Sequence, residues 1–274
     1  MTTTATDVIK DDDVAAIIEE RTQAMYQFRR AYRDHDATDL NSGSFTFPEA
    51  TDDARDEMVE VVEDADYPRT SLDYGGVDAE YTKDGVEIAI SDEAVSDSAI
   101  DIIADAIGEM GIAAESKNDS EAFTGLSDNQ NSTVVGTDGS DMNFGAVVEA
   151  YTTLVDDEYQ PSQFELYLSP DAWGDLATDT NFNRATDQGD ALAREGQLGT
   201  VFGVPVVMTN TGDLGADEGL MVDTSKFGYE STRWEREVTN YREERKDRDV
   251  YKIRDRLDFV VMDGQSNLFI QGGV

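Results

Sequence analysis

The chain contains no cysteine in its 274 residues, which excludes disulfide bonds, thiol catalysis and zinc sites built on thiolates. Its one histidine, His35, lies in a polar stretch. We expect it to be an ordinary surface residue, because a Ser-His-Asp triad needs a histidine nearer to the folded core. No apolar run approaches the ~20 residues that span a bilayer. The first residues also lack the basic and apolar regions of a signal peptide. We therefore expect a soluble chain without a membrane partner that stays in the cell that makes it.

Basic residues are scarce: 21 Lys and Arg face 60 Asp and Glu, giving a net charge of −39. Such self-repulsion destabilises a compact fold at low salt, but the Debye length falls to ~3 Å at 1 M salt. A disordered acidic chain is the alternative. However, 39% of the residues are hydrophobic and fall in periodic runs, which disordered chains lack. The composition therefore indicates a folded protein adapted to molar salt, as in the cytoplasm of haloarchaea.

Motifs for catalysis or cofactor binding are also missing. The Gly-rich stretch 199–203 is not followed by the Lys-Ser/Thr of a phosphate loop. Residues 138–143 lack the alternation and closing Glu of a calcium loop, and we expect Ser140 or Asp141 to cap the following helix instead. We predict no catalytic, cofactor or metal site. A halophilic acidic hydrolase is the alternative from another class, and abundant carboxylates are its only support.

The first 90 residues contain one predicted helix and one predicted ribbon. Apolar residues recur at helical spacing over 14–33, and the acid-free part of this helix carries Arg21, Arg29, Arg30 and Arg33. Residues 34–56 read as an extended arm. Strand-like runs follow near 58–63 and 86–90, separated by a turn-rich stretch, and Asp84-Gly85 adds a hairpin-type turn. A two-stranded ribbon is marginally stable alone, so we expect it to lie on a neighbouring subunit.

The rest of the chain alternates helices and buried strands. Ser91 is a good N-cap for a long helix to about residue 118, and a second helix follows Asn143 and stops before Pro161. Ser169-Pro170 opens a short helix. A mobile loop is expected at 178–198. The strands are predicted at 163–168, 200–209, 219–223, several stretches of 227–261, and 267–271.

This order of segments resembles the major capsid proteins of tailed viruses, the Hong Kong 97-type shell fold. The resemblance rests on Ser91-Asp92-Glu93 at the start of the long helix, on Phe123-Thr124-Gly125 after it, on Leu166–Trp173, and on Gly203-Val204-Pro205-Val206-Val207. It implies an α+β fold of five parts: an N-terminal arm at 1–52, an extended E-loop hairpin at 53–90, a spine helix with the first part of the peripheral domain at 91–160, an axial domain at 161–224, and the second part of the peripheral domain at 225–274.

The resemblance implies a structural protein that assembles with itself into hexamers and pentamers of an icosahedral virion shell around double-stranded DNA, bound without sequence specificity. Assembly would take place in the host cytoplasm, with a portal and with scaffolding or decoration proteins as further partners. Only about 90 residues precede the spine, so a separate scaffolding protein, or none, is implied. Lys83 is the only lysine of the E-loop region, and we expect no isopeptide cross-link. Within the same fold, an encapsulin-type cellular shell is the alternative.

Basic residues mark the candidate contacts between subunits. Nine of the 21 lie between Arg233 and Arg256, against seven acids. They can pair with acids of their own subunit or with a neighbour's acidic patches, for which the planar guanidinium is suited; direct contact with DNA is a third possibility. The predicted contact residues are Arg21, Arg29, Arg30, Arg33, Pro68, Arg69, Tyr74, Arg233, Arg236, Arg242, Arg245, Arg254 and Arg256.

Overall fold

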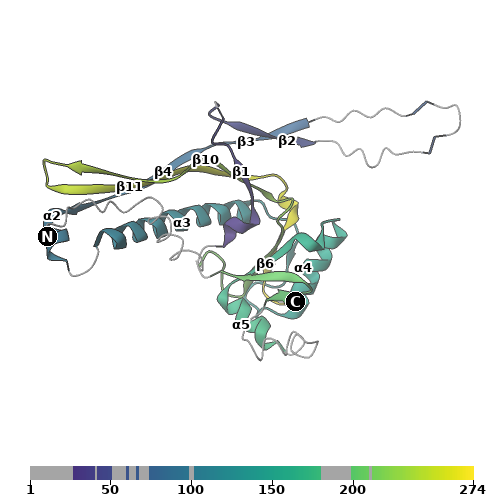
Figure 1. Ribbon diagram of the computed structural model, residues 1–274. Helices are drawn as coiled ribbons and strands as arrows, with labels where there is room; N and C mark the ends of the chain where they lie inside the picture. Colours follow the sequence, from purple (N-terminus) through teal and green to yellow (C-terminus); the bar gives the residue numbers. More distant parts are fainter. Residues whose placement is uncertain are drawn as a thin grey trace.

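The computed structural model describes residues 27–40, 42–50, 60–61, 66–67, 74–98, 102–179, 199–209 and 212–274. It contains two bodies, each with its own sheet built of strands from distant parts of the chain, and a hairpin that projects from the first body (Figure 1). Among the described residues, no helix is long and apolar enough to cross a membrane.

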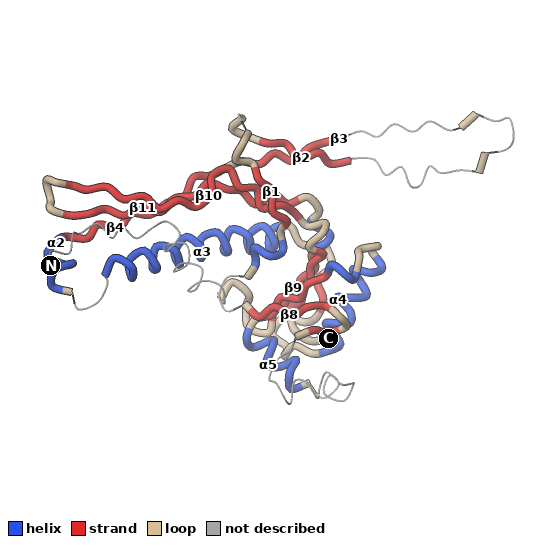
Figure 2. The backbone as a smooth tube through the Cα atoms, viewed as in Figure 1, coloured by secondary structure: helices blue, strands red, loops and turns tan. Residues whose placement is uncertain are grey.

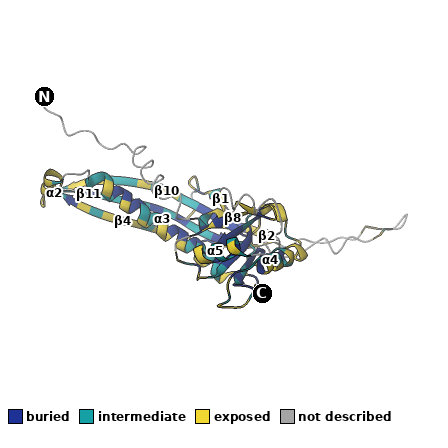
Figure 3. Ribbon diagram, turned by 90° about the horizontal axis from the view of Figure 1, so that it is seen from below, coloured by how far each residue is buried: buried dark blue, intermediate teal, exposed yellow. Residues whose placement is uncertain are grey.

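The first body is a four-stranded sheet with one long helix along it. Strands β10 (Gly228–Glu243) and β11 (Arg248–Val261) form an antiparallel hairpin, β4 (Thr82–Ser91) pairs with β11, and β1 (Arg33–Asp36) runs parallel to β10. Helix α3 (Ile102–Asp128) lies along one face of this ribbon (Figure 2). Its Ile107 and Met110 pack against Ile253 of β11. Around residues 253–257 of β11, buried residues alternate with partly exposed ones, as expected for a strand with one covered face (Figure 3).

The predicted spine helix is two helices. Ser91 caps α2 (Asp92–Asp97) as expected, its Oγ accepting a hydrogen bond from the Ala94 amide at 3.2 Å. Ser98 is extended, with ψ 138°, and ends α2 there. Helix α3 then continues past the predicted end at residue 118, because Ala122 and Leu126 extend its buried stripe under the second core cluster.

The N-terminal helix prediction is wrong at its end. Its residues up to 26 lie outside the described part of the chain. Beyond them the chain forms a short 3-10 helix, η1 (Phe28–Ala31), and then enters β1. Phe28 is fully buried, with its ring 4.8 Å from that of Phe123 and 5.7 Å from that of Tyr167. Burial of this aromatic side chain anchors the segment on its own subunit, where we expected an arm leading away from the core.

The projecting hairpin pairs β2 (Phe45–Ala50) with β3 (Tyr74–Ala79). It begins earlier than the sequence predicted, and the expected partner strand at 86–90 belongs to β4 and pairs with β11 instead. Asp84-Gly85 makes no turn, because both residues lie inside β4 opposite Asp255 and Arg254. Long-range pairing with β11 overrides the local turn signal.

The second body is a six-stranded sheet in the order β5-β12-β9-β6-β8-β7. Ser169 caps α5, the helix predicted to open at Ser169-Pro170, by accepting from the Ala172 amide, and the Asn143 side chain caps α4 by accepting from the Ala146 amide. Asn143 thus takes the capping role expected of Ser140 or Asp141. The elements are β5 (Val134–Val135), α4 (Phe144–Asp156), η3 (Pro161–Gln163), β6 (Phe164–Leu168), α5 (Pro170–Thr178), β7 (Thr200–Val201), β8 (Val204–Met208), β9 (Glu218–Asp223), η4 (Gly264–Ser266) and β12 (Asn267–Gln271).

This sheet crosses the predicted domain boundaries. Strand β5 and helix α4 come from the stretch assigned to the first peripheral part, and β12 comes from the second. β5 and β12 join the sheet of β6, β7, β8 and β9, the strands that were expected to form the axial domain alone, and α4 packs against it. The loop predicted at 178–198 lies outside the described residues from 180 onwards.

Candidate assembly surfaces

A chain of buried and partly buried charges joins the N-terminal segment, α3 and the first sheet. The guanidinium of Arg29 binds Glu115 of α3 at 2.7 Å and also pairs with Glu230 of β10. Glu115 pairs in turn with Arg236, which lies 3.3 Å from Asp255. Burial alone would raise the pKa of Glu115, but the two guanidinium groups hold it below its ordinary value. The network therefore fixes three separate elements to one another.

Asp119 lies beside this network and caps η1. Its Oδ1 accepts a hydrogen bond from the Phe28 amide at 2.8 Å, while its Oδ2 is buried without a partner among the described residues. Desolvation raises the pKa of Asp119 to about 6, and the backbone hydrogen bonds from Phe28 and Arg29 only partly offset that effect.

Of the nine predicted contact arginines that the structure describes, five have acidic partners within the same chain. Arg254 lies 2.6 Å from Glu237 across the β10–β11 hairpin. Arg242 binds Asp92 at 2.7 Å and Asp249 at 3.3 Å. Such pairs between strands of one subunit are the first of the three alternatives that the sequence left open. Their role at a subunit interface stays a prediction.

Arg233 and Arg256 bind backbone carbonyls. Arg233 donates to the carbonyl oxygens of Ala37 and Thr38, at 2.9 and 2.6 Å, and also to that of Leu40. Arg256 donates from Nε to the carbonyl of Tyr81 at 3.2 Å. Neither has a carboxylate within ion-pair distance among the described residues.

The remaining candidates lie on the surface or outside the described residues. Arg30 lies 3.3 Å from Glu165, and the Arg33 guanidinium lies 4.1 Å from the centre of the Tyr229 ring. Tyr74, the first residue of β3, is 68% exposed, and Arg245 is exposed at the tip of the β10–β11 hairpin. Arg21, Pro68 and Arg69 lie outside the described part of the chain.

Sequence reasoning missed two features. Half-buried His35 is part of an aromatic cluster: its ring centre lies 4.6 Å from that of Phe45 and 4.8 Å from that of Phe47, and its Nδ1 is 2.9 Å from Ser231 Oγ. The expectation of an ordinary surface histidine is therefore wrong. The second feature is Trp234, 41% exposed, with Arg254 and Arg256 within 5.6 Å of its ring centre. The alternation of Arg with other residues on β11 was the signal for a shared face.

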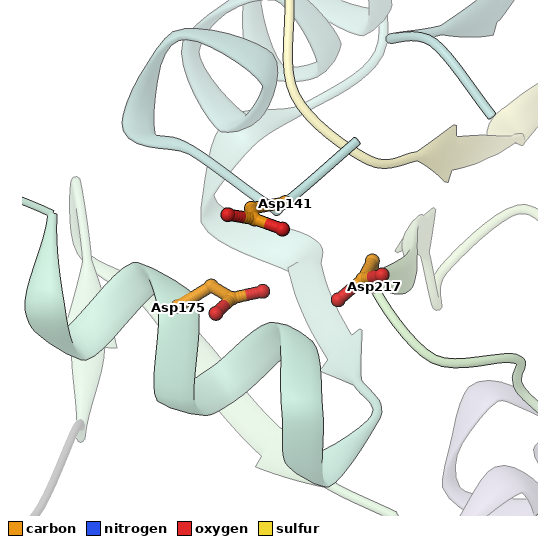
Figure 4. A group of neighbouring side chains, drawn as sticks. All are labelled: Asp141, Asp175 and Asp217. Carbon is orange, nitrogen blue, oxygen red and sulfur yellow. The ribbon is translucent and has the colours of Figure 1, made fainter. Parts of the chain in front are cut away.

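Three carboxylates converge in the second body, between the loop before α4, α5 and the turn before β9 (Figure 4). One oxygen each of Asp141, Asp175 and Asp217 lies within 4.8 Å of the others. Desolvation and the neighbouring Asp217 raise the pKa of Asp175. Calcium takes ~6–8 oxygen ligands, and these three acids alone do not make such a site. We describe the cluster as a point of charge repulsion and assign it no metal.

The arrangement of helices and strands described above is similar to that of several solved structures. The chain is similar to a structure from Mycobacterium phage Che8, with a TM-score of 0.73 at 14% identity over 92% of this chain and 93% of that one. The capsid structure of the cyanophage P-SCSP1u matches with a TM-score of 0.72 at 11% identity, over 100% of this chain and 93% of that one. The mature capsid of bacteriophage PhiM1 matches with a TM-score of 0.68 at 12% identity, over 89% and 86%.

At these identities the structures show a shared fold. The comparison with curated proteins gave no match. A family model described as phage capsid protein matches residues 79–265, which is more than half of the chain and includes α3, five of the six strands of the second sheet and the β10–β11 hairpin. The chain therefore belongs to the phage capsid protein family, a family of structural proteins that build the shell of the virion.

Proposed function

We propose that this chain is a Hong Kong 97-type major capsid protein that assembles into hexamers and pentamers of an icosahedral shell. The shell would enclose the double-stranded DNA of a tailed virus that infects a haloarchaeon, and it would form in the host cytoplasm together with a portal. In this proposal the β2–β3 hairpin is the E-loop, α3 is the spine, the first body is the peripheral domain and the second body is the axial domain.

One observation carries the proposal: among the described residues, the β2–β3 hairpin is held to its own subunit only at its root. Phe47 of β2 and Ala79 of β3 are buried against Val260 of β11. Farther out, Glu49, Tyr74 and Gly75 are exposed. Because an isolated two-stranded ribbon is marginally stable in water, a second copy of the chain is its natural support.

The haloarchaeal host is supported by charge. Copies of a −39 subunit repel one another unless salt screens them. The buried and paired carboxylates described above account for few of the 60 acids, so most of that charge is left to face solvent or other subunits.

Expression of the full chain in a haloarchaeal host tests the proposal. We expect closed hollow particles of uniform diameter in negatively stained micrographs of the purified protein, at molar salt. Small globular particles at all concentrations would contradict a shell function. A matched preparation in which residues 67–76 are deleted should give folded subunits that form no closed particles, because the outer part of the hairpin is then missing.

A further inference from the structure

Arg233 occupies an irregular position in β10. Thr232 pairs with Leu257 and Trp234 pairs with Arg256, so that two steps along β10 match one step along β11. Arg233 therefore has no partner on β11 and is the extra residue of a β-bulge. Bulges bend a strand locally and change the direction in which a side chain points.

The side chain of Arg233 reaches the place where the β2–β3 hairpin leaves the first body. The guanidinium donates to the carbonyls of Ala37, Thr38 and Leu40, three backbone acceptors in the four residues that follow β1. These residues form the incoming root of the hairpin, before β2. A planar fork with several donors can satisfy three carbonyls at once, which the point charge of a lysine cannot do in the same geometry.

The outgoing root is held from the neighbouring strand. Arg256 binds the Tyr81 carbonyl at 3.2 Å, and Asp258 accepts a hydrogen bond from the Glu80 amide at 2.7 Å. The Tyr81 hydroxyl lies 2.9 Å from Ser231 Oγ, the same atom that meets His35. Both roots are therefore fixed by side chains of the β10–β11 hairpin.

We propose that Arg233 is a positioning residue for assembly: it fixes the direction in which the β2–β3 hairpin leaves the subunit, and so the angle at which the hairpin meets a second copy. The inference rests on the proposed shell function. It assigns Arg233 a role within its own subunit, in place of a salt bridge to a neighbour. Loss of the clamp leaves the hairpin paired, because β2 and β3 keep their own ladder, but frees it to change direction relative to the first sheet.

Two substitutions test this role, Arg233→Gln and Arg233→Lys, with Arg248→Gln as the matched control. Arg248 lies on the same sheet and loses the same charge, but its partner is the side chain of Glu243 at the tip of the β10–β11 hairpin. We expect backbone amides in residues 37–47 to exchange hydrogen roughly tenfold faster or more in both Arg233 variants, with unchanged exchange in β6. Particles of the Arg233 variants should be open or of variable diameter, while those of Arg248→Gln stay uniform.

The two readouts separate the possible failures. Unchanged exchange at the root, or uniform particles of normal diameter despite faster exchange, would overturn the positioning role. Normal assembly of Arg233→Lys would show that charge alone suffices and would equally refute the clamp. If Arg233→Gln does not fold, Arg256→Gln loosens the outgoing root and must give the same change in particle diameter. If even the unmodified chain forms no particles, the shell function fails, and hydrogen exchange still decides whether Arg233 holds the root.

Discussion

Asp119 shows how one buried group can make stability depend on pH. Its folded-state pKa of about 6 lies above the ordinary value of 3.8, chiefly because burial disfavours the ionised form. The folded state therefore binds a proton more readily than the unfolded state. The contribution of this group to stability is most favourable below the ordinary pKa and is lost as the pH rises through about 6.

Replacing Asp119 by Asn keeps an oxygen that can accept from the Phe28 amide and removes the charge. At about pH 8 we expect Asp119→Asn to raise the free energy of unfolding by up to ~3 kcal/mol, since one pKa unit corresponds to ~1.4 kcal/mol. The gain should shrink between about pH 6 and pH 4. Chemical denaturation across this range measures it, with exposed Asp138→Asn as the control. A difference that is constant with pH would contradict the assignment.

At the level of single residues, sequence reasoning was reliable where the signal is local. The caps at Ser91 and Ser169 depend on a side chain and an amide three residues later. The cap of α4 was placed two or three residues too early, at Ser140 or Asp141, where the structure uses Asn143. The partners of Arg233 were not predictable, because they lie in a stretch about two hundred positions away. The bulge that directs its side chain depends on the register in which β10 and β11 pair, and this register cannot be read from the composition.

Among the secondary-structure elements, Glu115 joins three that are remote in sequence. Its ion pairs with Arg29 and Arg236 connect η1, α3 and β10. Because its folded-state pKa is lowered by these two groups despite burial, its stabilising contribution is present above its ordinary pKa and is lost as the pH falls below it.

We expect Glu115→Gln to lower the free energy of unfolding by about 2 kcal/mol at neutral pH, because it leaves two partly buried guanidinium groups short of a partner. The exposed pair of Lys117 and Glu121 on the same helix provides the control: Glu121→Gln should cost less than about 0.5 kcal/mol. Thermal unfolding of the two variants, measured side by side, decides the matter. Equal effects would mean that the buried network adds nothing beyond a surface pair.

The elements themselves were largely predictable, but their partners were not. The two strands of 227–261, the last strand and helices α4 and α5 follow from hydrophobic periodicity and caps. The transfer of residues 86–90 from the ribbon to the first sheet depends on β11 as a partner. Likewise, β12 joins a sheet whose other long strands precede it by more than forty residues.

For the molecule as a whole, net charge is the main obstacle to assembly. Bringing many copies of a −39 subunit into one shell is opposed by repulsion that salt relieves. On dialysis from about 1 M to about 0.1 M NaCl, where the Debye length grows from ~3 to ~10 Å, we expect particles to loosen or dissociate, as sedimentation would show. The partly buried Arg29–Glu115–Arg236 network should persist in the released subunits, because partly buried pairs are screened less than exposed ones. Particles that stay intact for days would contradict this account.

The pairing of β1 with β10 also determines when this part of the protein can fold during its synthesis. Arg33 lies opposite Tyr229, and Asp36 opposite Thr232, so β1 can find its partner only after the almost two hundred residues between them have been made. At ~5–20 residues per second, the intervening stretch takes on the order of ten to forty seconds to appear. Until then the hairpin has no root to hold it. If β10 aims the hairpin as proposed, a nascent chain without β10 cannot present a correctly aimed hairpin. We expect the order of synthesis to keep such partly made subunits out of a growing particle.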